Sequence, residues 1–336
     1  MIFENKKKAT LILADGTEFE GRAFGADGSV VGEIVFTTAM VGYQETLTDP
    51  SYCGQIVTQT FPLIGNYGVN SVDPESNGSV VSGYIVREQC EDPSNFRCEG
   101  DLDSYLKKYN IIGIYDIDTR HLTKIIRESG VMNGAIVHGD FDKEARLAQI
   151  RAYNVGKVVP KVSVKSKEYY PAENAKFNVV LMDYGYKFNI RRELVRRGCN
   201  VTVMPWNSTA DEIKALNPDG IMLSHGPVDP ADNTEAIQTL RELIPAQIPT
   251  FGICLGHQLL ALANGAKTEK LKYGHRGGNQ PVKDLALDRT FITSQNHGYA
   301  VVSGSVPAEA GEVSHVNGND GTCEGVRYHN APAFTV

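Results

Sequence analysis

From residue 177 onward the chain alternates short apolar runs with amphipathic segments. Four runs are almost continuously apolar, which is typical of strands covered on both faces: FNVVLMDYG, NVTVMPW, DGIMLSHG and IPTFGICLG. Between them lie three segments with apolar side chains at helical spacing: KFNIRRELVRRG, STADEIKALN and TEAIQTLRELI. The second helix is expected to be capped by Ser208 or Thr209. This alternation predicts an α/β domain with a mostly parallel sheet and helices on both faces.

The first half of the chain has a different, β-rich pattern. Asp15-Gly16 separates two apolar stretches and predicts a hairpin. Two helices are expected, one over residues 102–109 and one that begins at Thr119, as its N-cap, and stops at Gly130. No catalytic constellation stands out among these segments, so we interpret this half as a scaffold or docking domain.

The changes of pattern divide the chain into three parts. A β-rich α/β domain is expected over residues 1–150 and the strand–helix domain over residues 177–336. Residues 151–176 have two prolines and no helical period, which predicts a linker with room for one strand.

Three loops of the second domain follow directly after expected strands. They are DYGYK at 183–187, SHGPVDP at 224–230 and CLGHQ at 254–258. In open parallel sheets the ligand site lies beyond the carboxyl ends of the strands. The three loops should therefore converge on one crevice.

Cys254 lies in a pattern, Gly252-x-Cys254-x-Gly256, that has the form of a nucleophile elbow with cysteine in the serine position. The glycines are needed because the turn is sharp and brings backbones close together. A helix that begins after Cys254 would favour its thiolate, and the N–H of Leu255 could donate to an oxyanion. A lone cysteine is more often a small buried residue. The glycines, the strand before and the helix after favour the nucleophile here.

The residues alone leave the base for this nucleophile open. His297, in the turn-rich segment TSQNHGYAV, is the better candidate, and His225 is another. His257 lies three residues along the same helix as Cys254 and cannot easily turn back onto it. Two more histidines lie near the end of the chain, His315 and His329. A single histidine is more often structural than catalytic, so none of them is assigned.

Composition narrows the class of protein. The net charge of −7 over 336 residues argues against a broad nucleic-acid or membrane surface. The chain has no apolar run of membrane-spanning length and its start lacks the order of a signal peptide, which predicts a cytoplasmic protein. The six cysteines include no C-x-x-C pair, so neither a disulfide scaffold nor a metal site is suggested.

The segments FGICLGHQLLALANGAKTEKLKYGHRGGNQPV and SQNHGYAV resemble the flavodoxin-like glutaminase domain of class I glutamine amidotransferases. VGEIVFTTAMVGYQETLTDPSYCGQIV, IGNYGVN and DIDTRHLTKIIRESG resemble the N-terminal domain of the carbamoyl-phosphate synthase small-subunit family. The resemblance implies hydrolysis of glutamine through a cysteine thioester. It also implies a tunnel for ammonia to a separate large subunit, which makes carbamoyl phosphate from bicarbonate for arginine and pyrimidine synthesis. ATP and Mg would bind to that partner, and no cofactor to this chain.

The resemblance also implies roles for individual residues. Cys254 would be the nucleophile, and Leu255 and Gly226 would offer the N–H groups of the oxyanion hole. Glutamine would be held by Ser51, Gly226, Val228, Leu255, Gln258, Asn296, Gly298 and Tyr299. The loop of His297 is then a substrate clamp and not the source of the base. In this family the triad histidine and glutamate come from a His-Pro-Glu segment that follows the strand written here as APAFTV.

Two departures from the family matter. The sequence stops at Val336, where that segment should begin, so the triad histidine and glutamate are absent from it and we expect a truncated sequence. The family usually has asparagine at 225 and glycine at 228, where this chain has His225 and Val228. Valine tolerates positive φ poorly, so either the loop takes a different turn or the pocket is narrower, and both predict weaker use of glutamine.

These departures keep an alternative open, namely a docking subunit that binds the large subunit without hydrolysing glutamine. The intact elbow and clamp favour the enzyme. Amidotransferases of the anthranilate or GMP type are disfavoured because they have no domain like residues 1–140.

Overall fold

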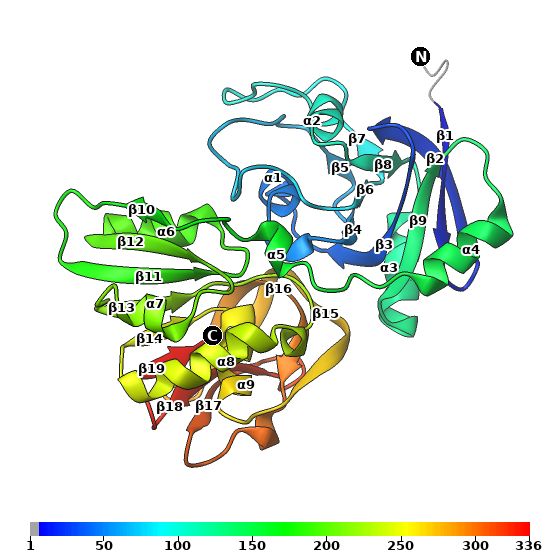
Figure 1. The fold of residues 1–336 in the computed structure, drawn as a ribbon. Coiled ribbons are helices and arrows are strands. Elements are labelled where there is room, and N and C mark those ends of the chain that lie inside the picture. Colours follow the sequence, from blue (N-terminus) through cyan, green and yellow to red (C-terminus); the bar gives the residue numbers. More distant parts are fainter. Residues whose placement is uncertain (1–6) are drawn as a thin grey trace. The chain divides into compact units, whose positions relative to one another are not determined.

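The computed structural model describes residues 7–336, which form two compact units (Figure 1). The first unit ends at Gly156 and the second covers Lys157–Val336. The interpretation of the chain's start as lacking a signal peptide rests partly on residues 1–6, which lie outside the described residues. Among residues 7–336, no helix combines the length and the apolar character that a membrane span requires.

The first unit is built around a closed seven-stranded barrel. Its strand order is β1-β2-β8-β6-β4-β3-β9. The strands are β1 (Lys8–Leu13), β2 (Glu18–Gly25), β3 (Ser29–Thr37), β4 (Gln55–Gln59), β6 (Gly83–Ile85), β8 (Ile112–Tyr115) and β9 (Met132–His138). β1 and β2 pair antiparallel around Gly16, whose φ is 93°, so the predicted hairpin is confirmed. A short pair, β5 (Leu63–Ile64) and β7 (Glu88–Gln89), lies outside the barrel.

The helices of this unit are α1 (Tyr43–Leu47), α2 (Leu102–Lys108), α3 (Thr119–Ser129) and α4 (Lys143–Ala152), with a 3-10 turn η1 at Pro50–Tyr52. Both predicted helices, α2 and α3, are confirmed, and Gly130 ends α3 as expected. The predicted cap was wrong by one residue. Asp118, not Thr119, accepts the N–H of His121 at 2.9 Å, because its carboxylate precedes the first helical residue and can reach back to the first turn.

The second unit contains a ten-stranded sheet with a parallel centre. Its order is β10-β12-β11-β13-β14-β19-β18-β16-β15-β17. The parallel strands are β12 (Cys199–Pro205), β11 (Phe177–Asp183), β13 (Gly220–Leu223), β14 (Thr250–Gly252) and β19 (Ala333–Thr335). All four apolar runs and the segment APAFTV are therefore strands, and the predicted α/β domain is confirmed.

Helices cover both faces of this parallel centre. They are α6 (Phe188–Arg196), α7 (Ala210–Lys214), α8 (Thr234–Leu243) and α9 (Leu255–Ala263). Val180 and Met182 of β11 belong to one core cluster with residues of α7, α8 and α9, whereas Leu181 packs in another with residues of α6. The alternation along β11 explains why its run is continuously apolar. Thr209 caps α7 in a capping box with Glu212.

Two segments contain elements beyond the expected pattern. Residues 151–176 contain one strand, β10 (Glu168–Tyr170), for which the predicted linker left room and which pairs with β12, and also a short helix that was not predicted, α5 (Val159–Val162). Antiparallel strands extend the sheet beyond β19: β15 (Thr268–Asp284), β16 (Arg289–Val301), β17 (Gly311–Asn317) and β18 (Cys323–Tyr328). The expectation that His297 lies in a loop was wrong, because its segment is strand β16. The Gly, Asn and Gln residues of this segment do not form a strand-like sequence pattern. The strand is stabilised by its pairing with β15.

In the first unit, a buried side chain makes the hydrogen bonds that a neighbouring backbone segment would make in a sheet or helix. Gln44 of α1 is 1% exposed, and its amide Nε2 donates to the carbonyl O of Asn70 at 2.6 Å. The N–H of Asn70 donates back to the Gln44 Oε1 at 2.9 Å. Both backbone groups of Asn70 therefore depend on one side chain for their hydrogen bonds.

We expect the substitution Gln44→Leu to lower the free energy of unfolding by roughly 2–4 kcal/mol, because it leaves two buried backbone groups without partners. Urea denaturation followed by circular dichroism measures this change. Gln149→Leu is the control, since Gln149 is an exposed residue of α4 and should change stability little. Equal midpoints for the two variants would contradict the assigned role of Gln44.

Candidate active site

Cys254 lies at a sharp turn between β14 and α9. Its backbone has φ 52° and ψ −106°, a conformation that costs a non-glycine residue energy and persists only when its surroundings hold it. The N–H of Cys254 donates to the carbonyl O of Val336 at 2.8 Å, and its own carbonyl accepts the N–H of Gln258 at 3.0 Å. Hydrogen bonds on both sides thus hold the strained residue at the N-terminus of α9.

The two glycines of the predicted elbow are required by close packing. A Cβ atom on Gly256 would lie 2.5 Å from the carbonyl O of Leu223, and one on Gly252 would lie 3.0 Å from the carbonyl carbon of Gly256. Neither glycine has positive φ, since at this turn only Cys254 does. Close approach of backbones, as predicted, and not left-handed conformation is therefore the reason for glycine at both positions.

The loop after β13 lies against the start of α9. The N–H of Gly256 donates to the carbonyl O of Ser224 at 3.0 Å. A Cβ on Gly226 would clash with the carbonyl O of Tyr184 and would come within 2.8 Å of the Leu255 side chain. The structure therefore brings Gly226 and Leu255, the two residues expected to form an oxyanion hole, next to each other.

The loop after β11 contacts the loop after β13. The N–H of Tyr184 donates to the Ser224 Oγ at 3.0 Å, and the N–H of Lys187 donates to the His225 Nε2 at 3.0 Å. Asp183 is 1% exposed and accepts the N–H groups of Gly185 and Tyr186, both at 2.8 Å. Burial raises the pKa of Asp183. The three loops that follow parallel strands converge as the sequence predicted.

Val228 departs from the ordinary geometry of its residue type. Its φ is 71°, in the left-handed region that a β-branched side chain disfavours. Asp229 follows and accepts the N–H of Ala231 at 2.9 Å, which caps the 3-10 turn η2 at Pro230–Asp232. The loop therefore keeps a backbone conformation suited to glycine although the sequence supplies valine.

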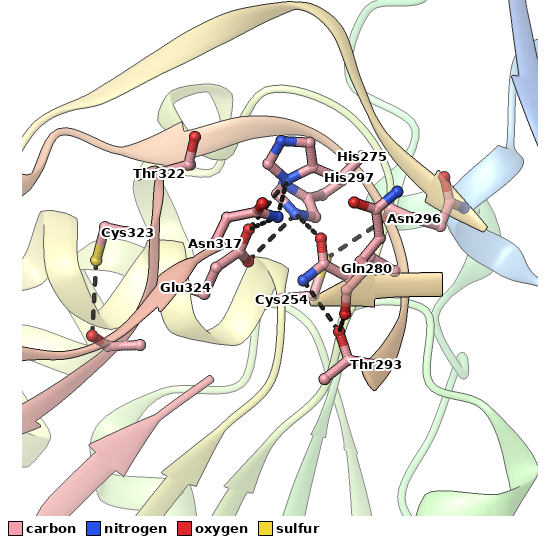
Figure 2. A network of polar contacts seen from close by, with 12 residues as sticks. Cys254, His275, Gln280, Thr293, Asn296, His297, Asn317, Thr322, Cys323 and Glu324 are labelled. Carbon is pink, nitrogen blue, oxygen red and sulfur yellow. Dashed lines mark hydrogen bonds and ion pairs between the residues drawn. The ribbon is translucent and has the colours of Figure 1, made fainter. Parts of the chain in front are cut away.

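Strand β16 brings several of the expected glutamine-binding residues to the elbow. The thiol of Cys254 lies 3.8 Å from the carbonyl O of Asn296 (Figure 2). The Gln258 Nε2, from the second turn of α9, donates to the carbonyl O of Tyr299 at 2.6 Å. Gly298 lies between these two β16 residues. Ser51, the remaining expected residue, lies in η1 of the first unit, where its N–H donates to the Asp49 Oδ1 at 2.9 Å.

The histidines considered as bases have other partners. The His297 Nδ1 lies 2.8 Å from the carbonyl O of Tyr299, and its Nε2 lies 3.2 Å from the Gln295 Oε1. His257 is buried, and its Nδ1 lies 2.7 Å from the Thr335 Oγ1. Burial lowers the pKa of His257 to about 4. These contacts give His297 and His257 structural roles.

Two polar residues beside this site were not predicted from the sequence. His275 of β15 and Glu324 of β18 are buried, and the His275 Nδ1 lies 2.9 Å from the Glu324 Oε1 (Figure 2). Burial opposes ionisation of Glu324, but hydrogen bonds to His275 and His297 outweigh it and lower the pKa of its carboxyl to about 2. No motif spacing could have identified this cluster, because its members come from three antiparallel strands.

Two family models match the chain. Residues 11–136 match the carbamoyl-phosphate synthase small chain, CPSase domain, and residues 180–336 match glutamine amidotransferase class-I. The carbamoyl phosphate synthase small chain of Bacillus cereus (strain ATCC 10987 / NRS 248) is 54% identical over 329 residues, 98% of this chain and 89% of that protein. Those of Fusobacterium nucleatum and Clostridium perfringens are 51% and 50% identical, over 97% and 98% of this chain and 90% and 93% of their own lengths.

The buried His257 predicts how stability depends on acid. The unfolded chain protonates this histidine near its ordinary pKa of 6.5, whereas the folded chain does so only near pH 4. The stabilising contribution of neutral His257 is therefore complete above pH 6.5 and is lost as the pH falls towards 4, by up to about 3 kcal/mol.

Urea denaturation followed by the fluorescence of Trp206, the single tryptophan, measures this effect in the second unit. We expect His257→Gln to flatten the loss of stability between pH 6.5 and 4.5, while His329→Gln, at an exposed position, keeps the slope of the parent. The same slope in all three proteins would show that His257 does not set it.

Proposed function

Because the chain belongs to the carbamoyl-phosphate synthase small-chain family, we propose that Cys254 is the nucleophile with which this glutaminase subunit hydrolyses glutamine. The observation that carries this assignment is the strained backbone of Cys254, φ 52°, at the start of α9. A cysteine with only a packing role has no need of this conformation. At an elbow it lifts the thiol above the sheet, toward the crevice at the strand ends.

The reaction that we propose is the one implied by the family resemblance, and the arrangement of the loops supports it. The Cys254 thiolate attacks the side-chain amide carbon of glutamine, and the amide oxygen becomes an oxyanion that accepts the N–H groups of Leu255 and Gly226. When the tetrahedral intermediate collapses, the C–N bond breaks and the nitrogen leaves as ammonia after taking up a proton. Water then cleaves the thioester, which releases glutamate and restores the thiol.

The base that exchanges these protons is, by the family resemblance, the histidine of a His-Pro-Glu segment. That tripeptide does not occur in residues 1–336. His297 is unsuited to the task because its Nδ1 is held by the carbonyl O of Tyr299 and its Nε2 faces the Gln295 Oε1. We therefore assign His297 to the support of the clamp strand.

The α-amino and α-carboxylate groups of glutamine need donors and acceptors at fixed positions. We assign these donors and acceptors to strand β16 and to the start of α9. The hydrogen bond from Gln258 to the carbonyl O of Tyr299 holds the strand against the helix. Within the second unit, the proposed glutamine site comprises Gly226, Val228, Leu255, Gln258, Asn296, Gly298 and Tyr299, and the family resemblance alone implies a role for Ser51.

The partner that follows from this function is the carbamoyl-phosphate synthase large subunit. It would receive the ammonia and bind the ATP and Mg used with bicarbonate. A soluble cytoplasmic complex is the setting we propose, since substrate and product are small polar molecules of amino-acid and pyrimidine synthesis.

A diazoketone analogue of glutamine tests the nucleophile, because it alkylates a reactive thiol that lies in a glutamine site. Mass spectrometry of the full-length protein should find the label on Cys254 and no label in Cys254→Ser. Cys90→Ser, which changes a half-buried cysteine of the first unit, should be labelled like the parent. A protein that stays unlabelled under these conditions would instead be a docking subunit without glutaminase activity.

Val228→Gly tests the cost of the valine in the oxyanion-side loop. Glycine adopts φ near 71° without strain, so we expect kcat/KM for glutamine to rise roughly two- to tenfold. Steady-state glutaminase assays of the full-length protein with its large subunit measure this change. Synthesis of carbamoyl phosphate from free ammonia, which bypasses this loop, should be unaltered. If glutamine use does not improve, the strain at residue 228 does not limit the reaction.

A further inference from the structure

A compact group of three buried or half-buried side chains lies on the antiparallel strands beside the elbow. His275 comes from β15, His297 from β16 and Glu324 from β18 (Figure 2). One nitrogen or oxygen atom of each lies within 4.8 Å of the corresponding atoms of the other two. The mechanism proposed above uses none of the three as a reacting group, so their convergence requires its own explanation.

The outward nitrogen of each imidazole is held by an acceptor. The His275 Nε2 lies 2.8 Å from the Asp320 Oδ2, and the His297 Nδ1 lies 2.8 Å from the carbonyl O of Tyr299. Both contacts place an N–H on the outward nitrogen. In a neutral ring the inward nitrogen, His275 Nδ1 or His297 Nε2, then carries a lone pair that points into the group.

Asn317 supports this assignment for His275. Its Oδ1 accepts the N–H of Asn319 at 2.9 Å, which fixes the orientation of the amide. Its Nδ2 therefore faces the group, 3.1 Å from the Glu324 Oε1 and 3.2 Å from the His275 Nδ1. An amide NH₂ can only donate, so both of these atoms act as acceptors toward it.

The second imidazole also faces acceptors. The His297 Nε2 lies 3.4 Å from the Glu324 Oε2 and 3.2 Å from the Gln295 Oε1. The Gln295 Nε2 donates to the Thr293 Oγ1 at 3.2 Å, so its oxygen is the atom turned to His297. If both rings are neutral, lone pairs of two imidazoles and an ionised carboxylate meet in a largely buried space, and this arrangement is favourable only with a bound proton or metal ion between them.

We propose that His275, His297 and Glu324 bind a divalent first-row transition metal ion, with Zn²⁺ as the best match. Two imidazoles and one carboxylate are an established ligand set for zinc, with bonds of about 2.0–2.2 Å and a fourth position left for water. Asp320 and the carbonyl O of Tyr299 occupy the outer positions at which metal-binding histidines usually donate their second N–H. The metal replaces a proton that would otherwise bridge the rings and the carboxylate.

Such an ion would join strands β15, β16 and β18. His297 lies between Asn296 and Gly298, so the ion would fix the strand that we assign to glutamine binding. This consequence for glutamine rests on the proposed function, whereas metal binding itself does not.

Titration of the full-length protein with Zn²⁺ against a chromophoric chelator tests the site without an activity assay. We expect one equivalent to bind, and the affinity to fall at least tenfold in His275→Asn and in Glu324→Gln. His329→Asn is the matched control, because His329 is exposed on the same unit, and should bind like the parent. Equal binding by all four proteins, or no binding by the parent, would overturn the proposal.

The six cysteines are the competing ligands, and Co²⁺ distinguishes them. Cobalt in the proposed site gives visible ligand-field bands without a thiolate-to-metal charge-transfer band in the near ultraviolet. A strong charge-transfer band that disappears after alkylation of the thiols would assign the metal to cysteine and refute the site. Glu324→Gln keeps the shape of the side chain, and its thermal melting without metal verifies that a loss of binding is not a loss of folding.

Discussion

The turn from β14 into α9 is the constraint on which the second unit depends. It forces Cys254 into a strained conformation and presses Gly256 against the carbonyl O of Leu223, so the strands on either side cannot shift independently. The hydrogen bond from the N–H of Gly256 to the carbonyl O of Ser224 transmits this constraint to the loop after β13. The loop after β11 is fixed in turn through the Ser224 hydroxyl. One turn therefore positions three loops, and the proposed oxyanion hole follows from their contact.

Strand β16 supplies contacts to the elbow that the parallel strands alone do not provide. It carries the backbone that meets Cys254 and Gln258, and its own position depends on antiparallel neighbours. The buried carboxylate of Glu324 lies between His275 and His297 and links three of these strands. Charge within a low-dielectric interior is costly unless it is compensated, so this polar group rigidifies the clamp only while every member has a partner. The proposed metal ion would fulfil that requirement.

Some strands could be predicted from the sequence and others could not, depending on whether burial or pairing determines their conformation. The strands from Phe177 to Gly252 were predictable because burial on both faces makes them continuously apolar. The strands from Thr268 to Tyr328 were not, because they are rich in Gly, Asn and charged residues and take their conformation from pairing. The N-cap of α3 was misplaced by one residue for a similar reason. Asp118 and Thr119 are both good capping residues, and the chain's path before the helix decides which one serves.

The sequence by itself predicted the elbow, and it supplied the residues that we propose surround it. The spacing of Gly252, Cys254 and Gly256 between an apolar run and a helix permits only a sharp turn, and family resemblance added the substrate. The tertiary structure alone decided which histidines are engaged elsewhere and that His275 and Glu324 meet beside the clamp. Contacts between strands that are distant in the chain cannot be predicted from sequence periodicity, because the periodicity of a segment reflects only its own burial.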